Sequence, residues 1–345
     1  MPRRLVFSGP FQVEAVSYED PPLAPRQVLV RTEWASGKHG TTAAMFDSGV
    51  FKGQRFDQDL RLFVPDDAPS ENVNFGKVGT SGVGSVAAVG AEVTRWRPGD
   101  RVLGRMDVAE TNVVDEGMLW PLGDIDPQLA LCLEPAYVSF HCIRESGLRY
   151  GDSVAVIGLG ALGLLAIAMA RAAGADRIFA IDPLPGRRRL ALEYGAEAAF
   201  DPRAGDAARR IHDATGGAGV DVAIELSGVT AGLSDAIRSC RVAGTVCSAG
   251  FYQRDAQGLW LGREWHHNRL TMVVPHGCGW GHPPRDFPRW DSRRAHDAIV
   301  SLMRQGKLQA PGLIDPVVGF DEVSDVYRLI RDDPDRVVKY AVRFA

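Results

Sequence analysis

The sequence predicts an α/β fold in which a β-rich domain precedes a doubly wound parallel sheet. The first observation is the segment Val154–Leu165, VAVIGLGALGLL, where an apolar strand-like run leads into a glycine-rich turn and then a helix-like run. The second is that strand and helix patterns alternate after this segment, which is typical of a parallel sheet. The third is a series of short strand candidates between turn residues in the first hundred residues, which indicates a compact β-rich domain.

The N-terminal half is expected to contain mostly strands. Leu5–Val16 and Gln27–Trp34 are strand candidates joined by a proline-rich turn, and a polar loop follows at residues 35–42. Residues 47–75 lack periodicity, which is typical of a substrate-side loop or a partner-facing insertion. The remaining expectations are a strand and turn at residues 78–90, a turn at residues 96–102 that leads into another strand, and a helix within residues 126–147.

The C-terminal half is expected to alternate between the two kinds of element. Helices are predicted at Arg187–Tyr194, Ala207–Thr215, Gly232–Cys240 and Arg294–Gln305. Strands are predicted at Arg177–Ile181, Ala198–Phe200, Val220–Leu226, Gly244–Ala249 and Val337–Phe344. The segment 264–268 is read as a structural turn, and residues 275–291 as a crossing segment.

The glycine-rich turn has the spacing of a dinucleotide-binding site. Gly158 permits a tight turn, Gly160 lets the backbone approach a pyrophosphate, and Gly163 lets the helix pack closely on the strand. The phosphates are expected at the N-terminus of this helix, beside Ala161 and Leu162, because unpaired N–H groups and the helix dipole favour negative charge there.

The next strand carries the signal for cofactor choice. It ends in Asp182, nineteen residues after Gly163, where a carboxylate can accept hydrogen bonds from the adenosine ribose hydroxyls. The same carboxylate would repel a 2′-phosphate, so NAD is favoured over NADP. Arg187 and the two arginines after it could hold a phosphate; the alternative is a solvated helix turn with one arginine stacking on adenine.

Composition excludes several classes of function. A net charge of −4 gives no reason to expect nucleic acid or an acidic membrane as partner. No apolar run is long enough to span a bilayer, and Met1–Arg4 is not followed by a signal-peptide core. The five cysteines form no CxxC pair, so a disulfide framework is not expected, and a reducing cytoplasm fits best.

Taken together, these patterns resemble the medium-chain dehydrogenase/reductase family. The markers are GSVAAVG at residues 84–90, PGDRV at 98–102, LEP at 133–135, the fingerprint with Asp182, DVAIELSG at 221–228 and VVKY at 337–340. The resemblance implies a GroES-like catalytic domain and a Rossmann NAD-binding domain inserted into it. The expected boundaries are 1–148 for the first part of the catalytic domain, 149–275 for the NAD-binding domain and 276–345 for the catalytic return.

The departures from the zinc members of this family predict that no metal is bound. Where those members carry a cysteine and a histidine ligand, this chain has His39 and Thr80, and only Glu134 keeps its usual acidic position. Catalytic zinc needs three protein ligands, and the four-cysteine lobe is also absent. The segment GTSGVG at 79–84 instead resembles the zinc-free branch related to bacteriochlorophyllide-type dehydrogenases.

Without zinc, side chains would remove the substrate proton. Thr41 matches the family position whose hydroxyl relays this proton, and His39 could be the general base. Glu134 could orient His39, or take the proton itself if burial raises its pKa. The alternatives are a helix cap for Thr41, a solvent-facing loop position for His39 and a backbone hydrogen bond for Glu134. Lys38 is a weaker candidate.

Four further residues are expected at the cofactor. Gly250 and Phe251 end a core strand, where open α/β sheets hold their ligands, and the resemblance adds Ser227 from the preceding strand. Lys339 matches a basic position that reaches the pyrophosphate in the family, although a surface lysine at a strand end is the competing interpretation.

The expected function is a cytoplasmic, zinc-independent NAD(H)-dependent dehydrogenase that interconverts a secondary alcohol and its ketone. Polar loop residues and tryptophans favour a sugar, cyclitol or glycosylated metabolite as the small-molecule substrate. The alternatives are a zinc-free NADPH-dependent quinone or enoyl reductase and a non-catalytic NAD-binding protein. The resemblance implies a homodimer or homotetramer.

Overall fold

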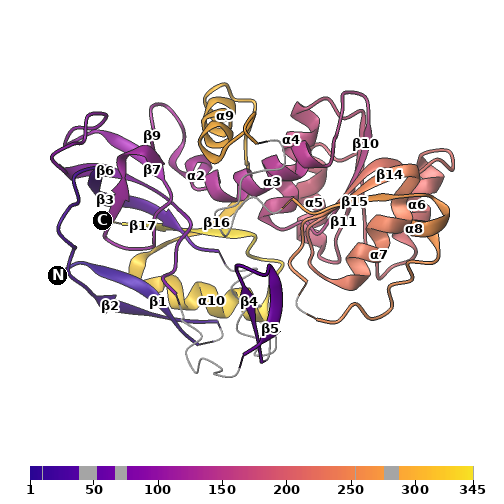
Figure 1. Cartoon of the computed structure of the whole chain (residues 1–345), viewed down its shortest axis with the longest axis horizontal. Helices are drawn as coiled ribbons and strands as arrows, with labels where there is room; N and C mark the ends of the chain where they lie inside the picture. The colour runs from indigo at the N-terminus through magenta and orange to yellow at the C-terminus, as the bar shows by residue number, and fades with distance from the viewer. Residues whose placement is uncertain (10, 39–52, 67–75, 253, 276–286, 345) are drawn as a thin grey trace.

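The computed structural model contains two large sheets joined by helices (Figure 1). It describes residues 1–9, 11–38, 53–66, 76–252, 254–275 and 287–344. The predicted α/β class, with a parallel sheet and a separate β-rich part, is confirmed. Among the described residues, no helix has the length and apolar character needed to cross a membrane.

The parallel sheet carries the glycine-rich turn. Its strands have the order β12-β11-β10-β13-β14-β15, and every neighbouring pair is parallel. The strands are β10 (Ser153–Ile157), β11 (Arg177–Ile181), β12 (Ala198–Phe200), β13 (Val220–Glu225), β14 (Cys240–Ser248) and β15 (Thr271–Val273). The helices are α4 (Ala161–Ala172), α5 (Pro185–Tyr194), α6 (Ala207–Ala214), α7 (Thr230–Ser239) and α8 (Glu264–His267). The strand order reverses between β10 and β13, which is where doubly wound sheets bind ligands.

The second sheet joins the two ends of the chain. Its main path is β16-β17-β3-β6-β7-β9, and β8 pairs with β3. The strands are β3 (Gln27–Ser36), β6 (Ser81–Val89), β7 (Arg101–Gly104), β8 (Thr111–Asp115), β9 (Leu119–Pro121), β16 (Ile314–Gly319) and β17 (Lys339–Arg343). The helices on this side are η1 (Glu116–Met118), α2 (Pro127–Ala130), α3 (Leu133–Glu145), α9 (Ser292–Arg304), η2 (Phe320–Glu322) and α10 (Val323–Asp332). Because β17 lies between β16 and β3, the C-terminal strand completes the N-terminal sheet.

Several expected elements were wrong in detail. The single strand expected at Leu5–Val16 is a hairpin of β1 (Arg3–Gly9) and β2 (Gln12–Ser17), because the chain reverses at Phe11, whose φ is 54°. The irregular region 47–75 contains a second hairpin, β4 (Gln54–Asp57) with β5 (Leu62–Pro65). The helix expected within 126–147 is divided into α2 and α3, and the turn expected at 264–268 contains the short helix α8.

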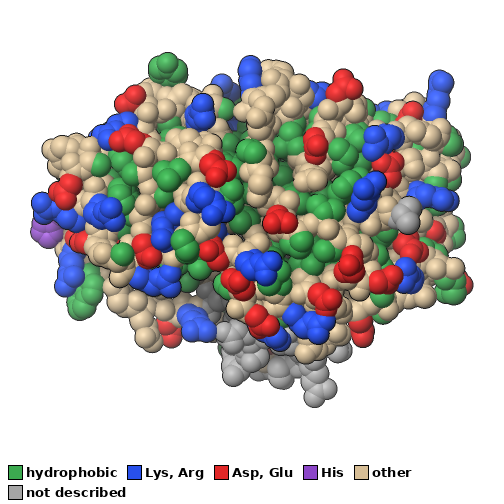
Figure 2. Space-filling model, turned by 180° about the vertical axis from the view of Figure 1, so that it is seen from behind, with side chains coloured by type: hydrophobic (Ala, Val, Ile, Leu, Met, Phe, Trp, Pro, Cys, Tyr) green, Lys and Arg blue, Asp and Glu red, His purple; other side chains and the backbone are tan. Residues whose placement is uncertain are grey.

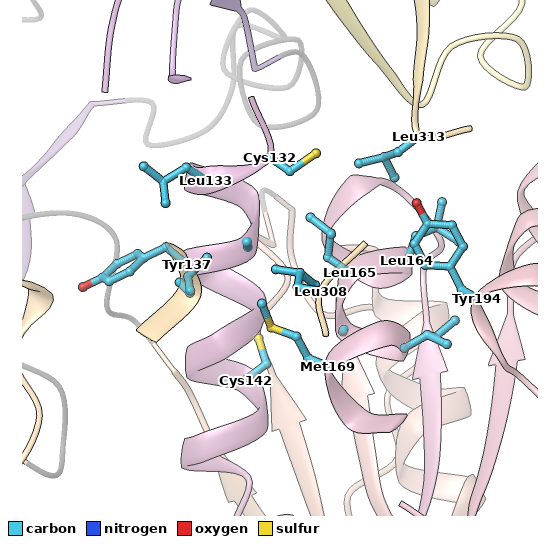
Figure 3. Packing of buried hydrophobic residues seen from close by; sticks show 14 of the residues in the cluster. Cys132, Leu133, Tyr137, Cys142, Leu164, Leu165, Met169, Tyr194, Leu308 and Leu313 are labelled. Atoms are coloured by element: carbon cyan, nitrogen blue, oxygen red, sulfur yellow. The ribbon is translucent and has the colours of Figure 1, made fainter. Parts of the chain in front are cut away.

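One continuous apolar core runs between the two sheets. In Figure 3, Cys142 on α3 lies near Met169 on α4, with Leu308 between the two helices. The hydroxyl of Ser139 also donates to the carbonyl of Leu162, at 2.8 Å. Helix α3 therefore links the β-rich part to the first turn of α4.

The described surface mixes charges of both signs. On the face shown in Figure 2, basic and acidic side chains alternate rather than forming a block of one sign. Four cysteines lie in the described part of the chain, and Cys132, Cys142, Cys240 and Cys247 are all buried thiols. No disulfide joins these four.

Candidate active site

The glycine-rich turn forms an open cradle at the N-terminus of α4. Gly158 has a φ of 87°, and a Cβ there would lie 2.6 Å from the backbone nitrogen of Ser227. A Cβ on Gly163 would overlap the carbonyl of Gly158, whereas one on Gly160 would meet nothing within 4 Å. Helix α4 has no side-chain cap, so its first N–H groups, including those of Ala161 and Leu162, face this open space. The cradle therefore fits a pyrophosphate.

Asp182 is buried beside this cradle. Its carboxylate accepts hydrogen bonds from the backbone amides of Leu159, at 2.7 Å, and Leu184, at 2.8 Å. A carboxylate has about four acceptor positions, so two remain for the ribose hydroxyls of a dinucleotide. The residues present therefore fit the adenosine half of a nicotinamide cofactor.

The arginines of α5 make contacts within the protein. Arg187 donates to the carbonyl of Pro334, at 3.0 Å. Arg188 donates to the carbonyl of Asp182, at 2.8 Å, and forms an ion pair with Asp201. These contacts direct both guanidinium groups at protein oxygens.

The carboxyl ends of β13 and β14 meet around Glu225. Its buried carboxyl accepts hydrogen bonds from the backbone and hydroxyl of Ser227, from the amide of Gly228 and from the hydroxyl of Tyr252. Tyr252 in turn accepts a hydrogen bond from Ser248, at 3.0 Å. Burial raises the pKa of Glu225, and the hydrogen bonds from these donors oppose the shift.

Three predicted cofactor residues lie in the loops around this carboxyl. Ser227 binds it directly, and a Cβ on Gly250 would come within 2.5 Å of the amide of Gly228. Phe251, the next residue, is 41% exposed. Sequence reasoning used Glu225 only as a family marker, and its position as the last residue of a buried strand was the available signal.

A second group of charged residues lies where the β-rich sheet meets α3. The ammonium of Lys38 and the carboxylate of Glu134 form an ion pair, with 3.2 Å between Nζ and Oε1. Lys339 is 4% exposed and donates to the carbonyl of Gly37, at 3.3 Å. Burial lowers the pKa of Lys339, and the nearby Glu134 opposes this shift. Residues separated by 300 positions are thus brought together by β3 and β17.

Two described residues at positions compared with the zinc ligands have partners within the protein. The hydroxyl of Thr80 donates to the carbonyl of Ser36, and the carboxylate of Glu134 already carries an ammonium partner. Within the described ranges, no three His, Cys, Asp or Glu residues gather as a metal site would require. His39 and Thr41, two of the three predicted catalytic residues, lie outside the described residues.

Comparisons with known proteins cover nearly the whole chain. A family model described as "Zinc-binding dehydrogenase" matches residues 161–291. A D-guloside 3-dehydrogenase from Escherichia coli is 33% identical over 353 residues, covering 99% of this chain and all of that protein.

Solved structures share the fold. The 2R,3R-butanediol dehydrogenase of Bacillus subtilis aligns with a TM-score of 0.79 and 24% identity over 99% of both chains. A zinc-binding dehydrogenase candidate from Sinorhizobium meliloti, bound to NADP, aligns with a TM-score of 0.76 and 22% identity, again over 99% of both chains. Because the similarity to the E. coli enzyme spans both sequences, this chain belongs to the medium-chain, alcohol dehydrogenase-like family of dehydrogenases.

Proposed function

We propose that this protein is a zinc-independent, NAD(H)-dependent dehydrogenase that interconverts a secondary alcohol and its ketone. The observation that carries the proposal is the Lys38–Glu134 ion pair. The resemblance implies that zinc members of the family hold their metal at the position of Glu134, and here this carboxylate is paired with a cation. The full-length similarity to a D-guloside 3-dehydrogenase favours a sugar or glycoside hydroxyl as the reacting group. Within this proposal, the protein is cytoplasmic and a homodimer or homotetramer.

The bound nicotinamide would accept the hydride. The chain's own residues would hold the proton and the charge on the carbinol oxygen. The ammonium of Lys38 can stabilise an oxygen that becomes negative, since it is 32% exposed and a substrate can approach it. The carboxylate of Glu134 can receive the proton, either directly or through the predicted residues His39 and Thr41.

The buried ammonium of Lys339 supports cofactor binding in this proposal. Among the described residues it donates to one carbonyl, and an ammonium has three donors. A pyrophosphate oxygen would be a further acceptor for this buried cation, which is the role expected from the sequence. The proposed domain limits, 1–148, 149–275 and 276–345, place Lys339 in the catalytic return and the cradle in the NAD-binding domain.

The test combines metal content with activity. Protein purified without chelator is expected to contain no stoichiometric zinc and to oxidise members of a glycoside and polyol panel with NAD after treatment with a chelator. Glu134→Gln is expected to lower kcat by about 10²–10⁴-fold while the Kd for NADH changes little. The matched control is Glu92→Gln, which removes the same charge from an exposed position.

Three results would contradict the proposal. One zinc per chain with loss of activity on chelation would make Glu134 a metal ligand. Reduction of quinones or enones with NADPH, and no alcohol oxidation, would favour the reductase. Tight NAD binding without turnover on any substrate would favour a non-catalytic NAD-binding protein.

A further inference from the structure

An acidic residue of the C-terminal segment occupies the N-terminus of the helix that follows Asp182. The backbone amide of Gly186, in the first turn of α5, donates to both carboxylate oxygens of Asp335, at 3.0 and 3.1 Å. A Cβ on Gly186 would lie 2.8 Å from Asp335 Oδ1, so glycine permits this close approach. The two residues are 149 positions apart in sequence.

Helix α5 depends on this contact for its cap. Leu184 is its N-cap residue and offers no side-chain hydrogen bond, and Pro185 has no N–H group. Asp335 therefore supplies, from outside the helix, the negative group that a helix N-terminus favours. The neighbouring contact of Arg187 with the carbonyl of Pro334 holds the same loop against the same turn.

The first turn of α5 lies next to the carboxylate that is predicted to bind the ribose. Asp182 follows β11 and has free acceptor positions for the adenosine ribose, and α5 begins three residues later. A 2′-phosphate on that ribose would approach the N–H groups of this turn. The amides of Leu184 and Gly186 are both occupied, by Asp182 and Asp335.

Two of the nearby arginines are held by contacts within the protein. Arg187 and Arg188 are held by protein carbonyls, and Arg188 also pairs with the carboxylate of Asp201. A phosphate at the start of α5 would therefore meet two carboxylates and displace one of them from its amide.

We propose that Asp335 is a specificity-determining residue that disfavours NADP, because its carboxylate occupies the helix N-terminus that a 2′-phosphate would use. This proposal rests on the proposed function for its cofactor, and it adds a residue from the catalytic return to the choice between NAD and NADP. In this proposal, the carboxylate of Asp182 binds the ribose hydroxyls, and the carboxylate of Asp335 repels the 2′-phosphate.

The experiment titrates the full-length protein with ADP-ribose and with 2′-phospho-ADP-ribose at low ionic strength, and with NADH and NADPH by fluorescence. The variants Asp335→Asn and Asp335→Lys change the local charge in two steps. The Kd for the 2′-phosphorylated ligands is expected to fall about tenfold in Asp335→Asn and to fall further in Asp335→Lys. The Kd values for ADP-ribose and NADH should change by less than about twofold in both variants. The gain is expected to shrink as salt is added.

The control is Asp333→Asn, an exposed acidic residue two positions earlier on the same loop. It is expected to leave all four Kd values within about twofold. Equal effects of the Asn variants at 333 and 335, or no gain at 335 in protein whose thermal midpoint is unchanged, would overturn the proposal for Asp335 alone. A wild type that binds neither nucleotide, or that prefers NADPH, would overturn the proposed cofactor and this inference with it.

Discussion

At the scale of single residues, two buried ionisable groups have pKa values shifted by burial. Glu225 is completely buried among neutral donors, and Lys339 is almost completely buried beside a backbone carbonyl. Burial raises the pKa of the acid and lowers that of the base, so each shift favours the neutral form. Both groups border the predicted cofactor site, where such shifts are typical of function.

Glu225 should make stability depend on pH. Its pKa is raised above the ordinary value of 4.5, so the folded protein binds more protons than the unfolded chain at pH values between 4.5 and the raised pKa. The contribution of Glu225 to the free energy of unfolding is therefore fully present below pH 4.5 and is lost as pH rises through the folded pKa. The loss is about 1.4 kcal/mol for each pH unit between the unfolded and folded pKa values. Urea unfolding from pH 4 to 8 should show this loss in the wild type and not in Glu225→Gln.

A second variant tests whether the titration of Glu225 causes this loss of stability. Tyr252→Phe removes one donor from the ionised carboxyl, so the pKa of Glu225 should rise further and the loss of stability should extend to higher pH. An identical slope in the wild type and in Glu225→Gln would show that another group titrates in this range.

Lys339 should change stability with pH in the opposite direction to Glu225. Its pKa is lowered below 10.5, so the unfolded chain binds more protons, and stability rises as pH increases through the folded pKa. Lys339→Met should remove this rise in urea unfolding and weaken NADH binding about tenfold, since the pyrophosphate loses its cation. The exposed Lys307→Met is the control, and equal losses of NADH affinity in both variants would contradict the role of Lys339.

At the scale of elements, the sequence predicted the parallel sheet better than the β-rich part. Strands β10, β11 and β12 and the start of α4 were expected at their observed positions, because buried parallel strands are continuous apolar runs. The hairpin of β1 and β2 was missed, since its turn depends on one residue with positive φ. Strand β16 and helix α10 were not expected, and the contact of β17 with β3 is invisible to local patterns.

The candidate site also combines features that local sequence predicts with contacts that it does not. The cradle and Asp182 follow from local spacing, so they could be expected from the sequence. The Lys38–Glu134 pair and the Asp335–Gly186 contact join segments 96 and 149 positions apart, and no local signal marks them. Asp335 in particular lies in a segment that the sequence analysis did not connect with the cofactor.

Two glycines of one turn should have different effects when replaced. Gly160→Ala adds a methyl group to open space, so its thermal midpoint should stay within about 2 °C while NADH binding weakens at least about tenfold. Gly163→Ala would overlap the carbonyl of Gly158, so it should lower stability by about 1–3 kcal/mol. Differential scanning fluorimetry and NADH fluorescence measure both effects, and a stable Gly163→Ala would contradict the packing described here.

At the scale of the whole molecule, one large hydrophobic cluster spans the two sheets. The same cluster of buried residues includes Leu103 of β7, Leu133 of α3, Leu164 of α4 and Ile299 of α9. Contacts between the catalytic return and α5 add polar links across the same boundary. The cofactor site is therefore formed between parts that are packed together before any ligand binds.

This shared core predicts that the chain unfolds as one cooperative unit. Leu103→Ala and Leu164→Ala remove completely buried side chains from opposite ends of the cluster, and each should cost about 2–5 kcal/mol. Because the cluster is continuous, both variants should lower the midpoint of the same single calorimetric transition, with equal van't Hoff and calorimetric enthalpies. If the scan instead resolves two transitions, one lowered only by the β7 variant and the other only by the α4 variant, the sheets unfold independently. The cofactor would then have to bring the two parts together, and NADH would raise the α4 transition alone before it raised the other.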